Sequence, residues 1–343
     1  MISFLNDYNT IAASEVLSYI NKYSTGKYCG YGQDELTNYA KELIRKEIKH
    51  DAEIFFISGG TMTNLMVIQS MLKSYEACIS VLEGHINTLE TGAIENTGRK
   101  ILTVPSVNGK ITVEAISEVL KNHHGFHMVI PKMVYISNAT EAGTVYTKEE
   151  LQELYRYCQE KGLYLFIDGA RLGTALVASG ATLEDIYLNS DVFYIGGTKN
   201  GAMFGEAVCF KNSSLCEGFL HSMKQHGALM AKGFNLGIQF IALFETDLFY
   251  QLAKKANDIA SYLASELKKI KIDIKNNPEA NQVFISITTN LRKVLEKNFL
   301  FTLMDEKDGL ETIRLVTTYN SQFAEVDAFI SAIKAFQQDI KKY

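Results

Sequence analysis

The sequence predicts an α/β fold with a mostly parallel seven-stranded sheet, helices on both faces, and a small α+β domain at the C-terminal end. Short apolar segments alternate with amphipathic helical segments through the first two-thirds of the chain. Most of these apolar segments are continuous, which favours strands buried on both faces of a parallel sheet. The 343 residues, 47% of them hydrophobic, suffice for one large domain and a smaller one.

Seven apolar segments are expected to form the strands of the large sheet. They cover residues 53–58, 78–83, 100–105, 133–137, 163–168, 191–196 and 206–211. Between the strands, residues 147–162 predict a helix, since Thr147 and Glu150 have the spacing of a capping box and Gly162 supplies a C-terminal stop. Residues 34–48 predict an earlier amphipathic helix.

The pattern changes after residue 212. Helical patterns occupy residues 213–269, and apolar segments then follow at 282–287, 301–306 and 312–318, before a last helix. These elements indicate a small α+β domain. We expect a large domain at residues 1–245 and a small one at 246–343.

Composition excludes several classes of protein. The net charge of −5 gives no electrostatic case for binding nucleic acid or an anionic membrane. The five cysteines form no CxxC pair and indicate reduced thiols of a cytoplasmic protein. The first ten residues do not resemble a signal peptide, and no apolar segment is long enough to cross a bilayer. We expect no metal site.

A glycine turn follows the first strand of the large sheet, in the segment ISGGTMTN from Ile57 to Asn64. A helix that starts near Thr61 would present free backbone N–H groups, and Gly60 would let an anion approach closely. The turn alone also fits a Rossmann turn or a plain tight turn. The glycine spacing of a dinucleotide site is absent, and so is a Walker lysine.

Two charged residues follow the ends of neighbouring strands. Asp168 ends one segment and Lys199 follows the next, among four glycines. Each alone is more simply explained, Asp168 as a helix cap and Lys199 as a surface lysine. If their strands are adjacent, both lie at the edge where α/β folds bind ligands.

An acid, a lysine and a phosphate-binding turn in one crevice are together what pyridoxal phosphate requires of its binding site. The lysine forms a Schiff base with its aldehyde, the carboxylate keeps its ring nitrogen protonated, and fixed donors hold its phosphate. His85, in the segment LEGHINTLETGA, is a candidate for stacking on the ring and for proton transfer. A lone histidine is more often structural.

The chain resembles the threonine aldolase family of pyridoxal-phosphate enzymes, which have the fold type I of aspartate aminotransferase. The resemblance is greatest to the low-specificity L-threonine aldolase subgroup. It is carried by six segments: YGQDELTNYA, GGTMTN, GHINTLETGA, IDGARLG, IGGTKNGAMFGE and IRLVTT.

The resemblance implies a role for each candidate residue. Lys199 would carry the cofactor, His85 would stack on it, and Asp168 would pair with its ring nitrogen. Gly60, Thr61 and Thr198 would hold the phosphate. Arg171 would reach the ring hydroxyl or the substrate, and Arg314 would hold the substrate carboxylate. A homodimer or homotetramer is implied, with Lys232 and Tyr31 reaching a neighbouring subunit.

The chain departs from the family pattern in two segments. Leu5 and Asn6 precede Asp7 where the family usually has arginine and a serine that touches the substrate carboxylate, which makes Asn6 a candidate substrate-binding residue. The segment SNATEAG contains Thr140 and Glu141 but no histidine, whereas many members have one there.

The expected reaction is therefore retro-aldol cleavage of a β-hydroxy-α-amino acid, of the threonine or allo-threonine type, into glycine and an aldehyde. A base near His85 or Glu90 would take the β-hydroxyl proton. The alternatives are another pyridoxal-phosphate reaction, such as β-elimination or transamination, and an idle binding protein on the same fold. A nicotinamide oxidoreductase is disfavoured because the dinucleotide glycine spacing is missing.

Overall fold

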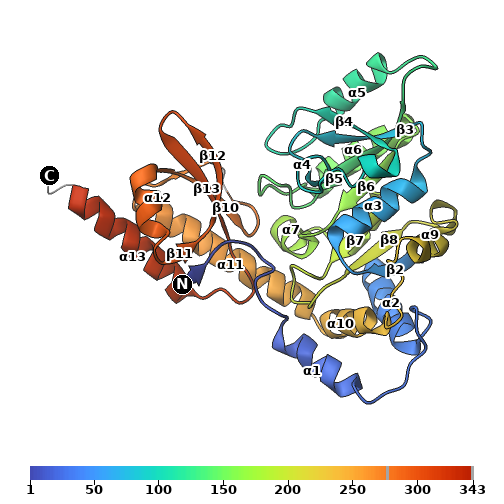
Figure 1. Cartoon of the computed structure of the whole chain (residues 1–343), viewed down its shortest axis with the longest axis horizontal. Coiled ribbons are helices and arrows are strands. Elements are labelled where there is room, and N and C mark those ends of the chain that lie inside the picture. Colours follow the sequence, from blue (N-terminus) through green and yellow to red (C-terminus); the bar gives the residue numbers. More distant parts are fainter. Residues whose placement is uncertain (276–277, 341–343) are drawn as a thin grey trace.

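A seven-stranded sheet forms the centre of the larger part of the molecule (Figure 1). The computed structural model describes residues 1–275 and 278–340. The strand order is β2-β8-β7-β6-β5-β3-β4, parallel throughout except where β8 pairs with β2 and β7. The strands are β2 (Glu53–Ile57), β3 (Glu76–Val81), β4 (Lys100–Val104), β5 (Ile130–Ser137), β6 (Tyr164–Asp168), β7 (Val192–Gly196) and β8 (Glu206–Phe210).

Helices cover both faces of this sheet, and consecutive side chains of one strand enter different cores. Leu165 and Ile167 of β6 belong to one apolar cluster, whereas Phe166 belongs to the other. The helices are α1 (Ser14–Tyr23), α2 (Glu35–Ile48), α3 (Gly60–Met71), α4 (His85–Thr88), α5 (Val113–Asn122), α6 (Lys148–Glu160), α7 (Leu172–Ser179), α8 (Leu183–Leu188), α9 (Phe219–Gln225) and α10 (Phe234–Phe244), with short 3₁₀ turns at Glu95–Thr97 and Ser213–Leu215. Burial on both faces explains why the strands are continuously apolar.

The C-terminal unit contains a four-stranded antiparallel sheet and three helices (orange to red in Figure 1). The sheet order is β12-β13-β10-β9. Its elements are α11 (Leu248–Lys269), β9 (Asp273–Ile274), β10 (Gln282–Thr288), α12 (Thr289–Leu295), β12 (Thr302–Lys307), β13 (Leu310–Val316) and α13 (Phe323–Ile340). A third apolar cluster, which includes Ile313 and Leu315, packs this sheet against the helices.

The first residues of the chain pack with this C-terminal unit. Strand β1 (Ile2–Ser3) pairs in parallel with β11 (Phe299–Leu300), and the ring of Phe4 lies 5.5 Å from that of Phe329. The backbone N–H of Val316 donates to the carbonyl of Phe4 at 2.9 Å. The chain then passes back to the large sheet, which places Asp7 between the two parts (Figure 1).

The expected α/β architecture is confirmed. All seven segments form strands of the large sheet, and the capping box of Thr147 and Glu150 starts α6. The short strands β1, β9 and β11 were not expected, because two residues carry no recognisable pattern. The domain boundary at residue 245 stays a prediction. Among the described helices, none combines the length and the apolarity that a membrane span needs.

Candidate active site

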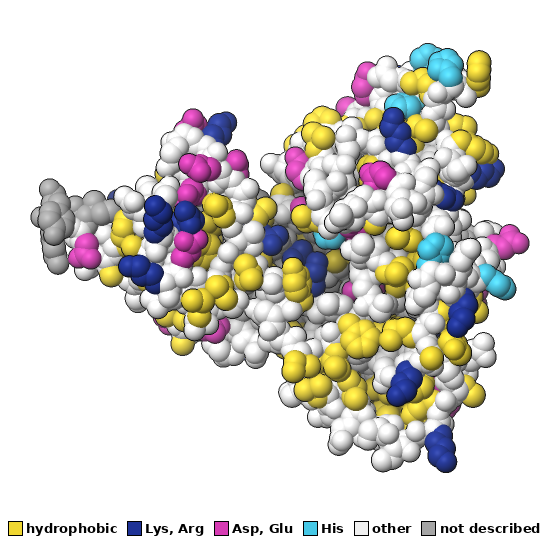
Figure 2. Space-filling view, in the orientation of Figure 1, with side chains coloured by type: hydrophobic (Ala, Val, Ile, Leu, Met, Phe, Trp, Pro, Cys, Tyr) yellow, Lys and Arg dark blue, Asp and Glu magenta, His cyan; other side chains and the backbone are white. Residues whose placement is uncertain are grey.

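The site forms where β5, β6 and β7 end, at the carboxyl edge of the large sheet. Strands β6 and β7 are parallel neighbours, so Asp168 and the loop that carries Lys199 lie side by side, as expected. Glycine makes this approach possible, because a Cβ added to Gly169 would lie 1.7 Å from the carbonyl oxygen of Tyr194. Figure 2 shows basic side chains and a histidine in the hollow between the two parts of the molecule.

Lys199 is partly buried in this hollow, and its pKa is lowered. Burial has the largest effect, and the neighbouring Arg171 adds to it. The charges of Asp7, Asp168 and Glu206 act in the opposite direction but do not compensate. A lowered pKa favours the neutral amine, which is the form that attacks a carbonyl carbon.

Glu206 fixes the backbone that presents Lys199. Its carboxylate accepts hydrogen bonds from the Gly197 N–H at 3.0 Å and from the Thr198 hydroxyl at 2.8 Å. Burial raises the pKa of Glu206 to about 8. The Thr198 oxygen also accepts the Gly205 N–H at 2.9 Å, so its hydroxyl lies within the loop. A contact between Thr198 and a phosphate therefore stays a prediction.

Asp168 is buried and accepts four hydrogen bonds. Tyr135 and Tyr194, from the two flanking strands, donate their hydroxyls at 2.5 Å each. The Asn64 amide and the Ala170 N–H donate at 3.0 Å each. Burial opposes the charged form of the carboxylate, but the charge of His85 and these hydrogen bonds outweigh it and lower the pKa of Asp168. Asp168 is thus held as an anion.

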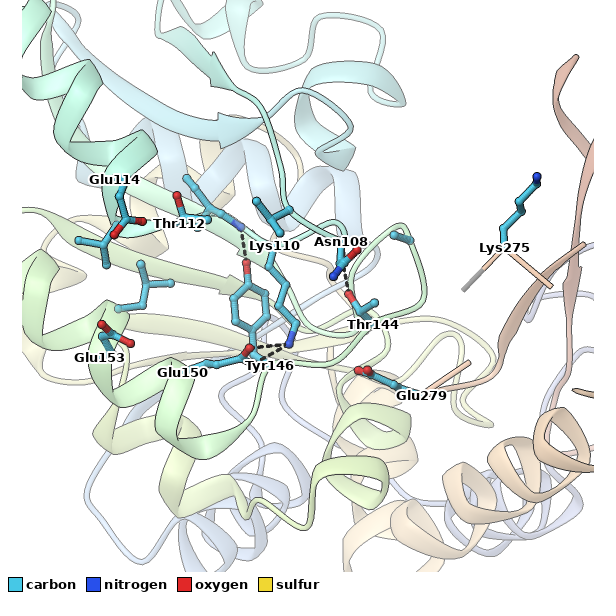
Figure 3. Close-up of a pocket in the computed structure, with 15 residues that line it drawn as sticks. Asn108, Lys110, Thr112, Glu114, Thr144, Tyr146, Glu150, Glu153, Lys275 and Glu279 are labelled. Atoms are coloured by element: carbon cyan, nitrogen blue, oxygen red, sulfur yellow. Dashed lines mark hydrogen bonds and ion pairs between the residues drawn. The ribbon is translucent and has the colours of Figure 1, made fainter. Parts of the chain in front are cut away.

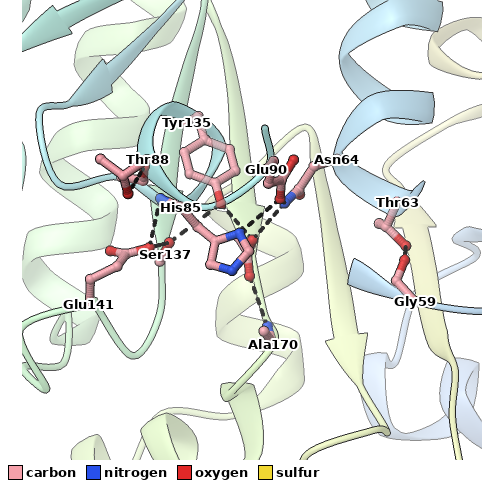
Figure 4. A network of polar contacts seen from close by, with 12 residues as sticks. Gly59, Thr63, Asn64, His85, Thr88, Glu90, Tyr135, Ser137, Glu141 and Ala170 are labelled. Atoms are coloured by element: carbon pink, nitrogen blue, oxygen red, sulfur yellow. Dashed lines mark hydrogen bonds and ion pairs between the residues drawn. The ribbon is translucent and has the colours of Figure 1, made fainter. Parts of the chain in front are cut away.

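His85 begins the short helix α4 and is held by a buried carboxylate (Figure 4). Its Nδ1 lies 2.8 Å from Oε1 of Glu90, which also accepts the Asn64 amide at 2.8 Å. Burial opposes a charge on the imidazole, but the hydrogen bond to Glu90 and the charges of Asp168 and Glu90 raise the pKa of His85. His85 is therefore oriented through one nitrogen and keeps the other ring edge available.

The glycine turn after β2 forms the N-terminus of α3, as expected. Gly59 is the N-cap and provides no side-chain cap, and Thr61 is exposed. A Cβ at Gly59 would meet nothing within 4 Å, whereas one at Gly60 would lie 3.2 Å from the Tyr194 hydroxyl. The start of this 12-residue helix thus has no side-chain cap and has free space at Gly59, an arrangement that suits an anion.

Arg171 is paired with an acid that the sequence reasoning did not assign to the site. Its Nε and Nη2 donate to the carboxylate of Asp7 at 2.7 and 3.0 Å, and Asn281 donates to the same carboxylate at 2.9 Å. Asn6, the expected substrate-binding residue, instead accepts the Tyr8 N–H with its side chain. A role for Asn6 toward a substrate stays a prediction.

Arg314 has no anionic partner among the residues that the structure describes. Its single hydrogen bond runs from Nη2 to the Thr302 hydroxyl at 3.4 Å, and its buried Nε has no partner. Burial and the nearby Arg171 guanidinium lower the pKa of Arg314. The charge of Asp7 raises the pKa of both arginines. A second carboxylate, such as that of an amino acid, would satisfy this pair.

The two expected cross-subunit residues lie away from the hollow. Tyr31 is exposed, and the ammonium of Lys224 lies 4.2 Å from its ring centroid. Lys232 is exposed on the loop before α10. The structure does not bring either residue to Lys199 within one chain, which leaves their roles across subunits as predictions.

A separate cleft of about 740 Å³ lies outside this site (Figure 3). Lys110 and Glu150 form an ion pair at 2.6 Å there, and the Tyr146 hydroxyl accepts the Ile111 N–H at 2.8 Å. None of the predicted site residues lines this cleft. We therefore assign the chemistry to the hollow that contains Lys199.

Several residues that line or support the hollow were not predicted from the sequence. They are Asp7, Asn64, Tyr135, Tyr194, Glu206 and Asn281. Tyr135 and Tyr194 stand within apolar strand segments, where a tyrosine is indistinguishable from core. Of these residues, Glu206 alone could have been found from the sequence, because it starts a strand of otherwise apolar residues and a carboxylate is rarely buried without a partner.

Comparison with solved structures first defines the class. An aromatic aminotransferase from Pyrococcus horikoshii superposes with a TM-score of 0.74 at 15% identity, covering 99% of this chain and 96% of the other. A threonine aldolase from Leishmania major superposes with a TM-score of 0.96 at 41% identity, covering 98% and 99%. The fold is thus the one that aminotransferases and threonine aldolases share.

Sequence comparison then defines the family. The model for beta-eliminating lyases matches residues 4–290. A low specificity L-threonine aldolase of Pseudomonas sp. is 32% identical over 338 residues, 97% of either chain, and one of Pseudomonas aeruginosa is 33% identical over 263 residues, covering 75% of this chain and 76% of the other. The chain belongs to the beta-eliminating lyase family.

Proposed function

We propose that this protein cleaves β-hydroxy-α-amino acids of the threonine type into glycine and an aldehyde, with pyridoxal phosphate as its cofactor. The observation that carries the proposal is the juxtaposition of Lys199, the anionic Asp168 and the unpaired Arg314 in one hollow. A lysine amine, a carboxylate and a carboxylate receptor are the groups this reaction requires. The relatives named as threonine aldolases support the substrate class.

The residues of the hollow fit the cofactor. The N-terminus of α3 at Gly60 and Thr61 would take the phosphate, His85 would lie against the ring, and Asp168 would pair with the ring nitrogen. Lys199 would provide the amine that binds the aldehyde. When bound, pyridoxal phosphate supplies an electron sink for the bond that breaks at the substrate α-carbon.

The chain's own residues then orient the substrate and handle its protons. Arg314 and Arg171 would hold the substrate carboxylate, which fixes the direction of the Cα–Cβ bond. Asp168 keeps its negative charge because Tyr135 and Tyr194 donate to it, and this charge would hold the proton on the ring nitrogen. When free, the neutral amine of Lys199 can accept a proton from the substrate α-carbon, and the ammonium that forms can return a proton to it.

A substrate panel tests this proposal. The purified protein, supplied with pyridoxal phosphate, should convert threonine, allo-threonine or phenylserine into glycine and the matching aldehyde. β-Elimination would instead release ammonia and a keto acid from these substrates, and transamination would produce a keto acid without an aldehyde. Either of these product patterns would contradict the proposed reaction. A protein that does not become yellow after it is mixed with pyridoxal phosphate and freed of unbound cofactor would favour a binding protein without catalytic activity.

We also propose that the protein acts as a homodimer or homotetramer in the cytoplasm. Large apolar side chains are exposed in the N-terminal part of the chain, at Tyr8, Ile11, Leu17 and Tyr31, and a second copy would cover them. All five cysteines are free, which suits a reducing compartment. Sedimentation at assay concentrations tests the assembly, and a fully active monomer would contradict it.

A further inference from the structure

Glu141 stands at the edge of the hollow, four residues after the end of β5, and the proposed function gives it no task. Its Oε1 accepts two hydrogen bonds, from the His85 backbone N–H at 3.0 Å and from the Ser137 hydroxyl at 2.6 Å (Figure 4). No hydrogen bond from another described residue reaches its Oε2, and this oxygen is not enclosed by the protein. One carboxylate oxygen is thus fixed and the other is available.

The turn that carries Glu141 is held from both parts of the molecule. The Gly143 N–H donates to the Thr140 carbonyl at 3.0 Å, and the Thr140 N–H donates to the Thr144 carbonyl at 2.9 Å. From β10, the Gln282 amide donates to the Thr140 carbonyl at 3.2 Å. Because the backbone is fixed on two sides, the free oxygen of Glu141 has a defined position.

The charged and titratable groups around Glu141 come from several elements. They are His85 on α4, Asp168 on β6, Arg171 before α7, Tyr135 on β5 and Tyr146 before α6. Burial has the largest effect and raises the pKa of Glu141, and the charge of Asp168 adds to it. The Ser137 hydrogen bond, the backbone N–H of Glu141 itself and the charge of His85 oppose this rise. A carboxylate with a raised pKa is a stronger base than an exposed one.

The other basic groups of the hollow are already committed. Asp168 accepts four hydrogen bonds. Glu90 pairs with His85 and Asn64 through Oε1, and its Oε2, although without a partner among the described residues, is enclosed in the protein and out of reach of a substrate. The pKa of His85 is raised, so the imidazole tends to keep its proton. Glu141 therefore combines an available oxygen, a fixed position and a basicity suited to accepting a proton.

Resting on the proposed function, we propose that Glu141 is the catalytic base that takes the proton from the substrate β-hydroxyl. The proton moves to Oε2 of Glu141, and the electron pair of the O–H bond forms the second bond of the aldehyde carbonyl. The Cα–Cβ bond breaks, and its electron pair stays with the α-carbon, supported by the cofactor. A proton then returns to the α-carbon, so glycine forms without any external oxidant or reductant.

A comparison of two reactions tests this role. Cleavage of threonine requires removal of the β-hydroxyl proton, whereas exchange of the glycine α-hydrogen in D₂O requires the cofactor and Lys199 but no β-hydroxyl. We expect Glu141→Gln to lower kcat for cleavage by at least about a hundredfold. We expect glycine exchange, cofactor binding and Tm to stay within about twofold, or about two degrees, of the parent.

Three further measurements make the result specific. Glu141→Asp should recover part of the cleavage rate, and Glu153→Gln, on the exposed face of α6, should behave as the parent. In the parent, kcat should fall as the pH drops through the pKa of Glu141, because only the carboxylate accepts a proton. Glu141→Gln should lack this acidic limb.

The outcomes separate this inference from the proposed function. Cleavage by Glu141→Gln within threefold of the parent would overturn the role of Glu141 while leaving the aldolase reaction intact. Loss of glycine exchange together with cleavage would also overturn it, because it would indicate a structural role. A parent protein that produces no aldehyde from any β-hydroxy amino acid would reject the proposed function, and this inference with it.

Discussion

Arg314→Met should make the protein more stable and less active at the same time. The guanidinium makes one long hydrogen bond, at 3.4 Å to Thr302, and its buried Nε has no partner. Burial and, to a smaller extent, the neighbouring Arg171 lower the pKa of Arg314, so the folded protein without substrate disfavours its charge. Methionine keeps the apolar stem and removes the unsatisfied group.

The expected changes in stability and in activity follow from two different contacts of Arg314, one within the protein and one with the substrate. Removing an unsatisfied buried donor should raise the free energy of unfolding by about 1 kcal/mol, the lower end of the cost of such a group. For a chain of this size this corresponds to a Tm increase of roughly 2 °C. A charge-assisted contact with the substrate carboxylate contributes about 1.5–3 kcal/mol, so kcat/KM for threonine should fall roughly 10- to 150-fold.

The assay compares threonine with threonine amide, which lacks the carboxylate. The parent should lose activity on the amide, and Arg314→Met should differ from the parent on the amide by less than about threefold. Arg314→Lys should also lose activity on threonine, because an ammonium lacks the planar fork. Arg292→Met is the matched control: Arg292 donates to Glu311 and Glu296 at 2.6 Å each, so this variant should lose stability and keep its activity. Equal losses on threonine and its amide, or a lower Tm for Arg314→Met, would refute the reasoning.

Three other variants test the remaining parts of the site. Lys199→Ala should fold but bind no reducible cofactor, and borohydride reduction with peptide mapping of the parent should find the label on Lys199; a label on any other lysine contradicts the assignment. Tyr194→Phe removes one of four donors to a buried anion and should cost about 1.5–3 kcal/mol in denaturant unfolding, whereas Tyr187→Phe, which loses a bond to the neutral carbonyl of Lys211, should cost less; equal costs would show that Asp168 is not anionic. Asp7→Asn breaks a buried pair with Arg171 and should cost about 3–5 kcal/mol near neutral pH. The pKa of Asp7 in the folded protein lies below its unfolded value of 3.8, so its stabilisation is complete above that value and is lost as the pH falls through the folded pKa. The difference between parent and variant should therefore shrink on acidification, and a difference that is constant down to about pH 2 would contradict it.

Local patterns in the sequence determined the large sheet and the residues at its strand ends. Continuous apolar segments predict buried parallel strands because such strands pack on both faces, and the structure contains all seven. Asp168 and Lys199 were predictable as neighbours because the carboxyl ends of adjacent parallel strands meet at one edge. The glycine turn that starts α3 at Gly60 was predictable because its glycines precede a helical segment, and its binding of an anion stays a prediction.

Only the tertiary structure decided which side chains support these groups. Asp7 reaches Arg171 because β1, at residues 2–3, pairs with β11, at residues 299–300. No local pattern in the sequence specifies a pairing between segments so far apart. Tyr135 and Tyr194 look like core residues in the sequence, and it is the strand order that brings both hydroxyls to Asp168. The available oxygen of Glu141 likewise depends on the hydrogen bond that its other oxygen accepts from His85, 56 residues away in the sequence, which no local pattern specifies.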